Sequence, residues 1–200
     1  MASGATWTTE DAFSALAQPR ALDGAGVTVQ PLSGLGLASV LARRGKGAEL
    51  AERLRTLHGV VLPDGARRSV NGRVALVGTA PGAWLAVSEA GPLGWADDLA
   101  HGLDGLASVS DQSDGYAAVR VQGPAVRDAL AKGVFLDLHP DAFPVGAAAV
   151  TIAAHIGLIL WRREADVFEL LCFRSNAHSL WHWLEESAAE YGLAVLPVAV

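Results

Sequence analysis

Three residues near the C-terminal end of this 200-residue chain have the types and the spacing of a metal site. His178, His182 and Glu185 are spaced i, i+4 and i+7, so a helix would carry two imidazoles and a carboxylate on one side. Such a set can hold a zinc ion. The pattern differs from His-Glu-x-x-His, because no general base lies between the two histidines. We therefore interpret these side chains as a polar helix face that packs against another subunit, with a metal-dependent hydrolase as the alternative.

Other reactive side chains have simpler structural explanations. Asp111 and Asp114 could form an acid–base pair, but both occupy a predicted turn, where aspartate is common because it bonds to the nearby backbone. Arg174 and Ser175 separate a strand from a helix and could receive an anion, although a helix cap with a surface ion pair is the simpler explanation. Cys172, the single cysteine, excludes an internal disulfide and is interpreted as a small buried hydrophobe. We assign no catalytic, cofactor-binding or metal-binding residue.

Nucleotides and nucleic acids are poor candidates as ligands of this chain. The segment Gly34-Leu-Gly-Leu-Ala-Ser39 lacks the third glycine of a dinucleotide loop, and the sequence contains no Walker loop and no Gly-x-Ser-x-Gly motif. The chain has 15 Lys and Arg against 21 Asp and Glu, whereas a nucleic-acid-binding protein normally carries a basic stripe.

The composition is apolar for a protein that acts alone. Hydrophobic residues make up 51% of the chain and charged residues only 18%. Either an Ala- and Gly-rich composition or a large protein–protein interface explains this. The N-terminus carries Glu10 and Asp11 instead of a basic lead, so we expect no signal peptide and a cytoplasmic protein.

Residues 142–161 contain no formal charge, and a run of this length could span a bilayer. Five residues interrupt the run: Pro144, Gly146, Thr151, His155 and Gly157. We therefore expect no membrane segment but two buried strands that meet near His155-Ile156-Gly157.

The segment 107–133 gives the most definite local prediction. Asp114-Gly115 is typical of a tight hairpin, because glycine accepts a positive φ, and the alternation after it predicts a strand. Gly123-Pro124 should open a helix that Gly133 closes with a left-handed cap. We predict a β-β-α unit whose two strands form a hairpin.

The order of predicted elements gives the fold class. We expect a flexible or docking N-terminal arm at residues 1–25, in which Trp7, Phe13 and Leu16 are able to dock on a neighbouring surface, then one α+β half at 26–106 and another at 107–200. The halves read β-α-β-β-α-β and β-α-β-β-α, which predicts two interlocked ferredoxin-like halves in one compact α+β unit.

Several stretches of the second half form a pattern when they are taken together: Leu130-Ala-Lys-Gly133, Leu136-Asp-Leu-His-Pro140, Phe143, Thr151, Ala154-His155, Arg174-Ser-Asn-Ala-His-Ser-Leu-Trp-His-Trp-Leu184 and Ala188-Ala-Glu-Tyr-Gly192. With these residues the chain resembles the gamma subunit of heterotetrameric sarcosine oxidase over about residues 27–192, most specifically from Ser110 onward. Gamma-type subunits of N-methylglutamate dehydrogenase are related, so the resemblance defines the family better than the amine substrate. It also implies the fold of the folate-binding domain of aminomethyltransferase.

The resemblance implies a non-catalytic assembly subunit of an enzyme that oxidises sarcosine to glycine, with formaldehyde or 5,10-methylenetetrahydrofolate and hydrogen peroxide as further products. FAD, FMN, NAD, tetrahydrofolate and zinc are then expected in the partner alpha, beta and delta subunits, and none in this chain. The expected interface residues are Arg174, Ser175, His178, His182 and Trp183. The alternative is a free-standing folate-binding or aminomethyltransferase-like protein of the same fold.

Overall fold

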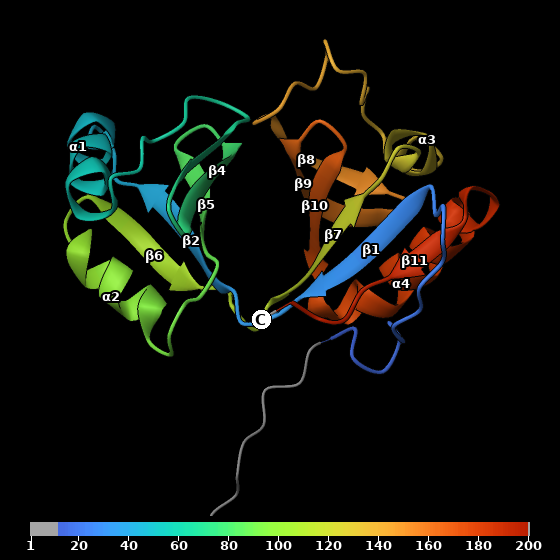
Figure 1. The fold of residues 1–200 in the computed structure, drawn as a ribbon. Helices are drawn as coiled ribbons and strands as arrows, with labels where there is room; N and C mark the ends of the chain where they lie inside the picture. The colour runs from blue at the N-terminus through green and yellow to red at the C-terminus, as the bar shows by residue number, and fades with distance from the viewer. Residues whose placement is uncertain (1–11, 200) are drawn as a thin grey trace, which may run out of the picture.

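The computed structural model describes residues 12–199 as two β-sheets that face each other, with helices on the outer side of each (Figure 1). The five-stranded sheet consists, in spatial order, of β3 (Arg68–Asn71), β4 (Val74–Ala80), β5 (Ala83–Ser88), β2 (Gly36–Ala42) and β6 (Ala107–Asp111). The six-stranded sheet consists of β11 (Leu193–Val195), β1 (Val27–Leu32), β7 (Tyr116–Gln122), β10 (Val167–Phe173), β9 (Ile156–Glu164) and β8 (Ala148–Ala153). This confirms the α+β class with two sheets.

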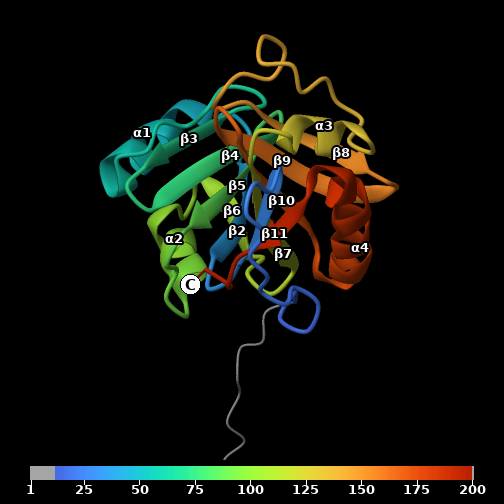
Figure 2. The same cartoon turned by 45° about the vertical axis from the view of Figure 1, so that its right-hand side comes forward.

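The helices occupy opposite outer sides of the molecule. They are α1 (Gly47–His58) and α2 (Trp95–Gly102) on the five-stranded sheet, and α3 (Val126–Ala131) and α4 (Ala177–Ala188) on the six-stranded sheet. Short 3₁₀ turns, η1 (Arg174–Asn176) and η2 (Ala189–Tyr191), flank α4. A view turned by 45° shows α4 standing beside its own sheet, far from α1 and α2 (Figure 2). No helix formed by residues 12–199 therefore lies between the sheets.

The N-terminal segment that the structure describes packs on its own chain. Phe13 is fully buried, with its ring centroid 6.0 Å from that of Trp181 in α4. Ala17 belongs to the same core, and Leu16 packs against it. Trp7, the third residue expected to dock, lies outside the described residues.

The chain passes between the sheets twice, and the second passage corrects the predicted hairpin. β6 pairs with β2 in one sheet, whereas β7 pairs with β1 and β10 in the other. Residues 112–115 do turn, and the Gly115 N–H donates to the Gln112 carbonyl at 2.9 Å. The turn leads the chain from one sheet into the other, because β6 and β7 pair with different strands and not with each other. The prediction that the two strands of the β-β-α unit form a hairpin is therefore wrong.

Strand membership also differs from the predicted division at residues 106 and 107. β1 lies in the six-stranded sheet between β11 and β7, although its residues belong to the predicted first half. β6 lies in the five-stranded sheet, although its residues belong to the predicted second half. Each sheet thus contains a strand from the other stretch of sequence, which interlocks the two halves.

The inner faces of the two sheets meet in a core of their own. The buried residues of this core are Leu32, Leu37, Ala75, Val77, Leu85, Val87, Ala118, Ala148, Ile159, Trp161 and Leu171, and they come from both sheets. Burial of apolar area at about 25 cal/mol per Å² favours closing the sheets on each other. The two sheets therefore share an apolar core.

The uncharged run at residues 142–161 forms β8 and the first part of β9, as predicted. Ala154 and His155 connect the strands with φ of 47° and 68°, the left-handed values of a two-residue hairpin turn. Within residues 12–199, no helix is both long and apolar enough to cross a membrane.

Gly133 is required for close packing and not for the predicted left-handed cap. Its φ is outside the left-handed region, but an added Cβ would lie 2.6 Å from Nε1 of Trp183. Trp183 is half-buried and packs against the core of the six-stranded half. The glycine thus lets α4 approach the end of α3.

We expect Gly133→Ala to lower the free energy of unfolding by about 1–3 kcal/mol, because the methyl group must displace the Trp183 indole. Gly47→Ala, at a glycine with open space around it, is the matched control and should be neutral. Urea denaturation measures both. Replacing Trp183 by Leu should remove most of the cost of Gly133→Ala, and an equal cost in both backgrounds would contradict the packing explanation.

Cys172 is fully buried in β10, as predicted, and burial raises the pKa of its thiol to about 11. Between about pH 9 and 11 the unfolded thiol ionises while the folded one stays protonated, so its contribution to the free energy of unfolding should fall as pH rises. The stability difference between wild type and Cys172→Ala, measured by urea denaturation, should shrink over this interval. A difference that is constant with pH would contradict the burial of a protonated thiol.

Candidate functional site

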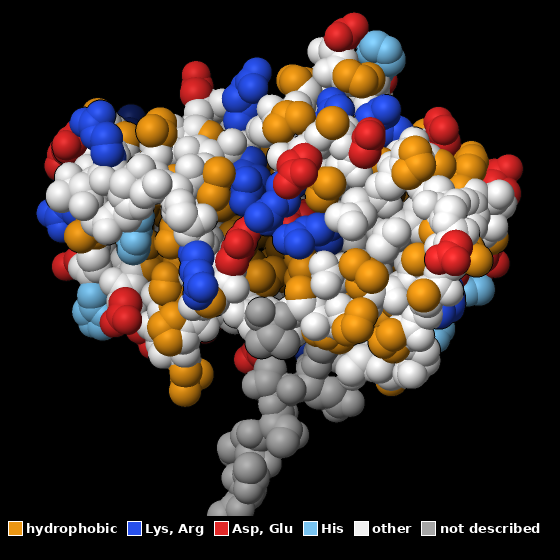
Figure 3. Space-filling view, in the orientation of Figure 1, with side chains coloured by type: hydrophobic (Ala, Val, Ile, Leu, Met, Phe, Trp, Pro, Cys, Tyr) orange, Lys and Arg blue, Asp and Glu red, His pale blue; other side chains and the backbone are white. Residues whose placement is uncertain are grey.

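The candidate site is the cleft between the two sheets, where charged side chains lie beside the shared apolar core. In the space-filling view, basic and acidic side chains gather between the two halves (Figure 3). The residues that form this charged network are Arg68, Glu89, Arg120, Arg163 and Glu169, together with the indole of Trp161.

Glu169 is the centre of the network. In the strand register it lies directly opposite Arg120 of β7 on one side and Trp161 of β9 on the other, so the three side chains share the inner face of the sheet. Its Oε2 accepts from Nε1 of Trp161 at 2.7 Å. Its Oε1 accepts from Nε and Nη2 of Arg120 at 2.9 and 2.7 Å. The carboxylate is nearly fully buried, and these bonds offset the cost of burying its charge.

Arg163 joins the network to the other sheet. Its Nη1 lies 3.1 Å from Oε1 of Glu169 and donates to Oε1 of Glu89, which follows β5, at 2.6 Å. Burial lowers the pKa of Arg163, but the bonds and charges of Glu89 and Glu169 outweigh burial, so the pKa is raised. A charge-assisted bridge thus links the two sheets across the cleft.

Arg68 at the start of β3 also faces this network. Its Nη2 lies 3.9 Å from Oε1 of Glu89. Burial lowers the pKa of its guanidinium, and the nearby carboxylates of Glu169 and Glu89 only partly oppose this effect. Arg68 is therefore the least satisfied member of the network.

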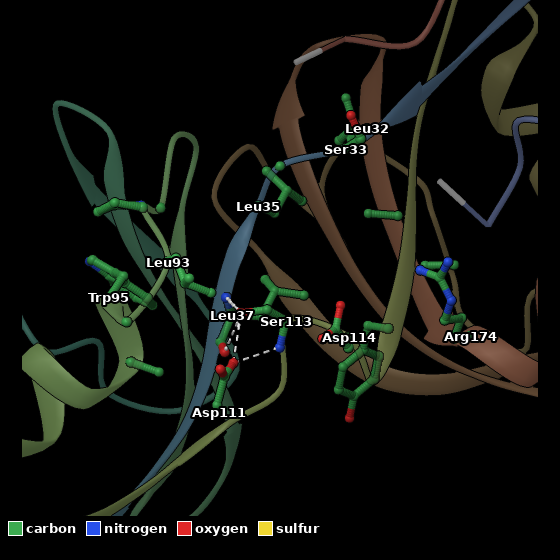
Figure 4. Close-up of a pocket in the computed structure, with 18 residues that line it drawn as sticks. Leu32, Ser33, Leu35, Leu37, Leu93, Trp95, Asp111, Ser113, Asp114 and Arg174 are labelled. Atoms are coloured by element: carbon green, nitrogen blue, oxygen red, sulfur yellow. Dashed lines mark hydrogen bonds between the residues drawn. The ribbon is translucent and has the colours of Figure 1, made fainter. Parts of the chain in front are cut away.

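A cavity of 280 Å³ lies where the two connecting segments cross between the sheets. Figure 4 shows Trp95 and Leu93 on one side of it and Arg174 on the other. Asp111 accepts bonds from the Ser113 hydroxyl at 2.7 Å and the Ser113 N–H at 2.8 Å.

These bonds from Ser113 lower the pKa of Asp111, so its carboxyl group stays ionised and cannot act as an acid near neutral pH. Asp114 lies on the far side of the turn (Figure 4). The structural role predicted for the Asp111 carboxylate in the turn is confirmed.

A second cavity, of 540 Å³, is more apolar. Tyr116 and Phe173, which stack with ring centroids 5.1 Å apart, line it together with residues of the other sheet such as Leu85. Val150 and Phe173 are more than half exposed there. Such a surface favours contact with another apolar group.

The predicted interface residues lie on and before α4, at the outer side of the molecule. Arg174, Ser175, His178 and His182 are exposed, while Trp183 is half-buried against Gly133. Asn176 takes the N-cap position, but no side chain caps the helix, because the 3₁₀ turn η1 continues directly into α4.

The three residues of the possible zinc site have other partners or lie apart. Glu185 pairs with Arg20 at 2.9 Å, and Nε2 of His182 lies 3.3 Å from Glu186. Among residues 12–199, no three His, Cys, Asp or Glu side chains are grouped so that they could hold a metal ion. The polar helix face is the better description.

Sequence reasoning missed the charged network. Its members come from four separate stretches of the chain, and the pairing of β10 with β7 and β9 brings only two of those stretches together. One signal was available: Glu169 interrupts the otherwise apolar run Phe168-Glu-Leu-Leu-Cys-Phe173. A charged residue within a buried strand requires a partner of opposite charge.

The chain matches the family described as sarcosine oxidase, gamma subunit family, over residues 45–190. It is 33% identical over 131 residues to the sarcosine oxidase subunit gamma of Corynebacterium sp. (strain P-1), which is 66% of this chain and 63% of that protein. It is 31% identical over 118 residues to the Arthrobacter sp. subunit gamma, covering 58% of each. The matched segments thus span less than two thirds of these relatives.

Solved structures give similar results over a longer stretch. A chain of the heterotetrameric sarcosine oxidase from Corynebacterium sp. U-96, in complex with pyrrole 2-carboxylate, matches with a TM-score of 0.81 and 25% identity, covering 94% of this chain and 98% of that one. Aminomethyltransferase T from Bartonella henselae matches with a TM-score of 0.61 and 18% identity, covering 87% and 48%, which establishes likeness of fold alone. The family match at residues 45–190 includes well over half of the residues of this chain, and the chain therefore belongs to the sarcosine oxidase gamma subunit family.

Proposed function

We propose that this chain is the gamma subunit of a heterotetrameric sarcosine oxidase and serves there as a non-catalytic assembly subunit. The match to the Corynebacterium sp. U-96 enzyme carries the proposal, because it extends over nearly the full length of both chains. An association with oxidoreductase chemistry follows from the same match and from the gamma-subunit relatives.

The proposal assigns the redox chemistry to other chains. FAD, FMN, NAD, tetrahydrofolate and zinc belong to the alpha, beta and delta subunits, and the complex oxidises sarcosine to glycine in the cytoplasm. The lack of a nucleotide-loop sequence in this chain supports that assignment. The buried carboxylate of the cleft, Glu169, is already engaged by Trp161, Arg120 and Arg163, which disfavours a free-standing folate-binding protein.

The surface of the chain supports an assembly role. Several large apolar side chains are more than half exposed: Val61, Leu93, Phe135, Val145, Val150 and Phe173. The exposed face of η1 and α4, with Arg174, Ser175, His178 and His182 beside Trp183, is proposed as one partner contact. Apolar and aromatic residues at such contacts supply binding energy once a partner excludes water from them.

Substitution of two exposed histidines should test the α4 contact. We expect His178→Glu together with His182→Glu to weaken assembly about tenfold or more, because two new negative charges would lie in a desolvated interface. Co-expression with the partner subunits, followed by quantified co-purification, is the measurement. His101→Glu, at an exposed histidine of α2, is the control and should assemble normally. Normal assembly of the double variant would exclude this face as a contact.

If the redox chemistry and the folate site belong to the partner subunits, the isolated chain should lack both activities. Alone, it should produce no sarcosine-dependent hydrogen peroxide, and tetrahydrofolate should leave its tryptophan fluorescence unchanged, whereas the co-purified complex should turn over sarcosine. Peroxide assays and a fluorescence titration measure these properties. Saturable micromolar binding of tetrahydrofolate by the chain alone would instead favour the folate-binding alternative.

A further inference from the structure

Arg68 is a largely buried cation with one donor that has no hydrogen-bond partner among the described residues and a long ion pair to Glu89. Its side chain is 10% exposed, and its Nε atom is buried without a hydrogen-bond partner among residues 12–199. The backbone around it is fixed, because the Arg68 N–H donates to the Gly146 carbonyl at 2.7 Å and the residue pairs with Val77 of β4. A guanidinium carries five donors in a planar fork and stays charged at physiological pH. Burying it without partners costs free energy.

The neighbouring carboxylates are already committed to other cations. Oε1 of Glu89 accepts from Arg163 at 2.6 Å, compared with 3.9 Å to Arg68. Glu169 is bonded by Trp161, Arg120 and Arg163. Three guanidinium groups thus share two carboxylates, and one positive charge remains uncompensated in the cleft. The charges of Glu169 and Glu89 raise the pKa of Arg68, whereas the neighbouring cations Arg163 and Arg120 lower it.

We propose that the cleft between the sheets binds a carboxylate group, held by the guanidinium of Arg68. A planar carboxylate fits the guanidinium fork with two parallel bonds, and its single charge balances the single excess cation. A doubly charged anion would leave excess negative charge beside Glu89 and Glu169. The carboxylate comes either from a small molecule in solution or from an acidic side chain of a neighbouring chain.

The proposal predicts opposite effects of two arginine substitutions on the chain alone. Arg68→Met should leave the unfolding midpoint unchanged or raise it, because a buried charge with only a 3.9 Å ion pair and one donor without a partner is replaced by an apolar side chain of similar length. Arg163→Met should lower the midpoint, because it removes a partner of both Glu89 and Glu169. Equal losses in both variants would mean that Arg68 is only a structural member of the network, and would overturn the proposal.

The small-molecule source is tested on the purified full chain. Acetate is substituted for chloride at constant ionic strength. Two quantities are measured: the unfolding midpoint and the NMR resonance of the Arg68 Nε–H, which is assigned by its loss in Arg68→Met. A saturable shift of the resonance, with a midpoint that rises with acetate in wild type but not in Arg68→Met, supports a free carboxylate. Arg67→Met, at the adjacent exposed arginine, is the charge-matched control and should respond like wild type.

The neighbouring-chain source is tested in the assembled complex. If acetate has no effect, Arg68→Met should weaken co-purification with the partner subunits about tenfold while Arg67→Met does not. The co-purification experiment rests on the proposed function, whereas the acetate experiment uses this chain alone. A wild-type chain that does not assemble with the partner subunits therefore leaves the acetate result valid. The carboxylate site is overturned if wild type does not respond to acetate and Arg68→Met assembles normally. It is also overturned if wild type does not respond to acetate and forms no complex with the partner subunits.

Discussion

The buried carboxylate of Glu169 is the interaction on which the arrangement of the two sheets depends. A charge this deeply buried is tolerated only with several donors, and β7 and β9 supply them from positions directly opposite in the register. Arg163 then extends the network to Glu89 on the other sheet. Because an ion pair is directional while apolar contact is not, the network fixes how the sheets meet, and the shared apolar core supplies most of the stabilisation.

Local features of this fold follow from local sequence. Leu50 and Leu54 lie four positions apart and are both buried along α1, and Gly59 ends this helix in the left-handed conformation that glycine favours. The apolar stripe of α4, from Ala177 to Ala188, is buried, opposite the polar face that the sequence predicts. The uncharged run forms two strands that meet at His155. In each case the deciding interactions lie within a few residues of one another.

Features that depend on residues far apart in the sequence could not be predicted from local sequence patterns. Asp114-Gly115 does turn the chain, but the strands on either side pair with β2, β1 and β10, which no local signal specifies. Gly133 looks like a helix cap until Trp183, fifty positions later, is placed against it. The charged network has the same origin, because Arg68 and Glu169 lie about a hundred positions apart in the sequence.

The chain belongs to the sarcosine oxidase gamma subunit family, and two of its features underlie the proposed assembly role. Nε of Arg68 is buried without a hydrogen-bond partner among residues 12–199, and several large apolar side chains are exposed. The most direct test is to prepare the partner subunits without this chain and to measure assembly by analytical ultracentrifugation. The account predicts that they fail to form the stable complex and regain it when this chain is added. A fully assembled complex in its absence would contradict the account.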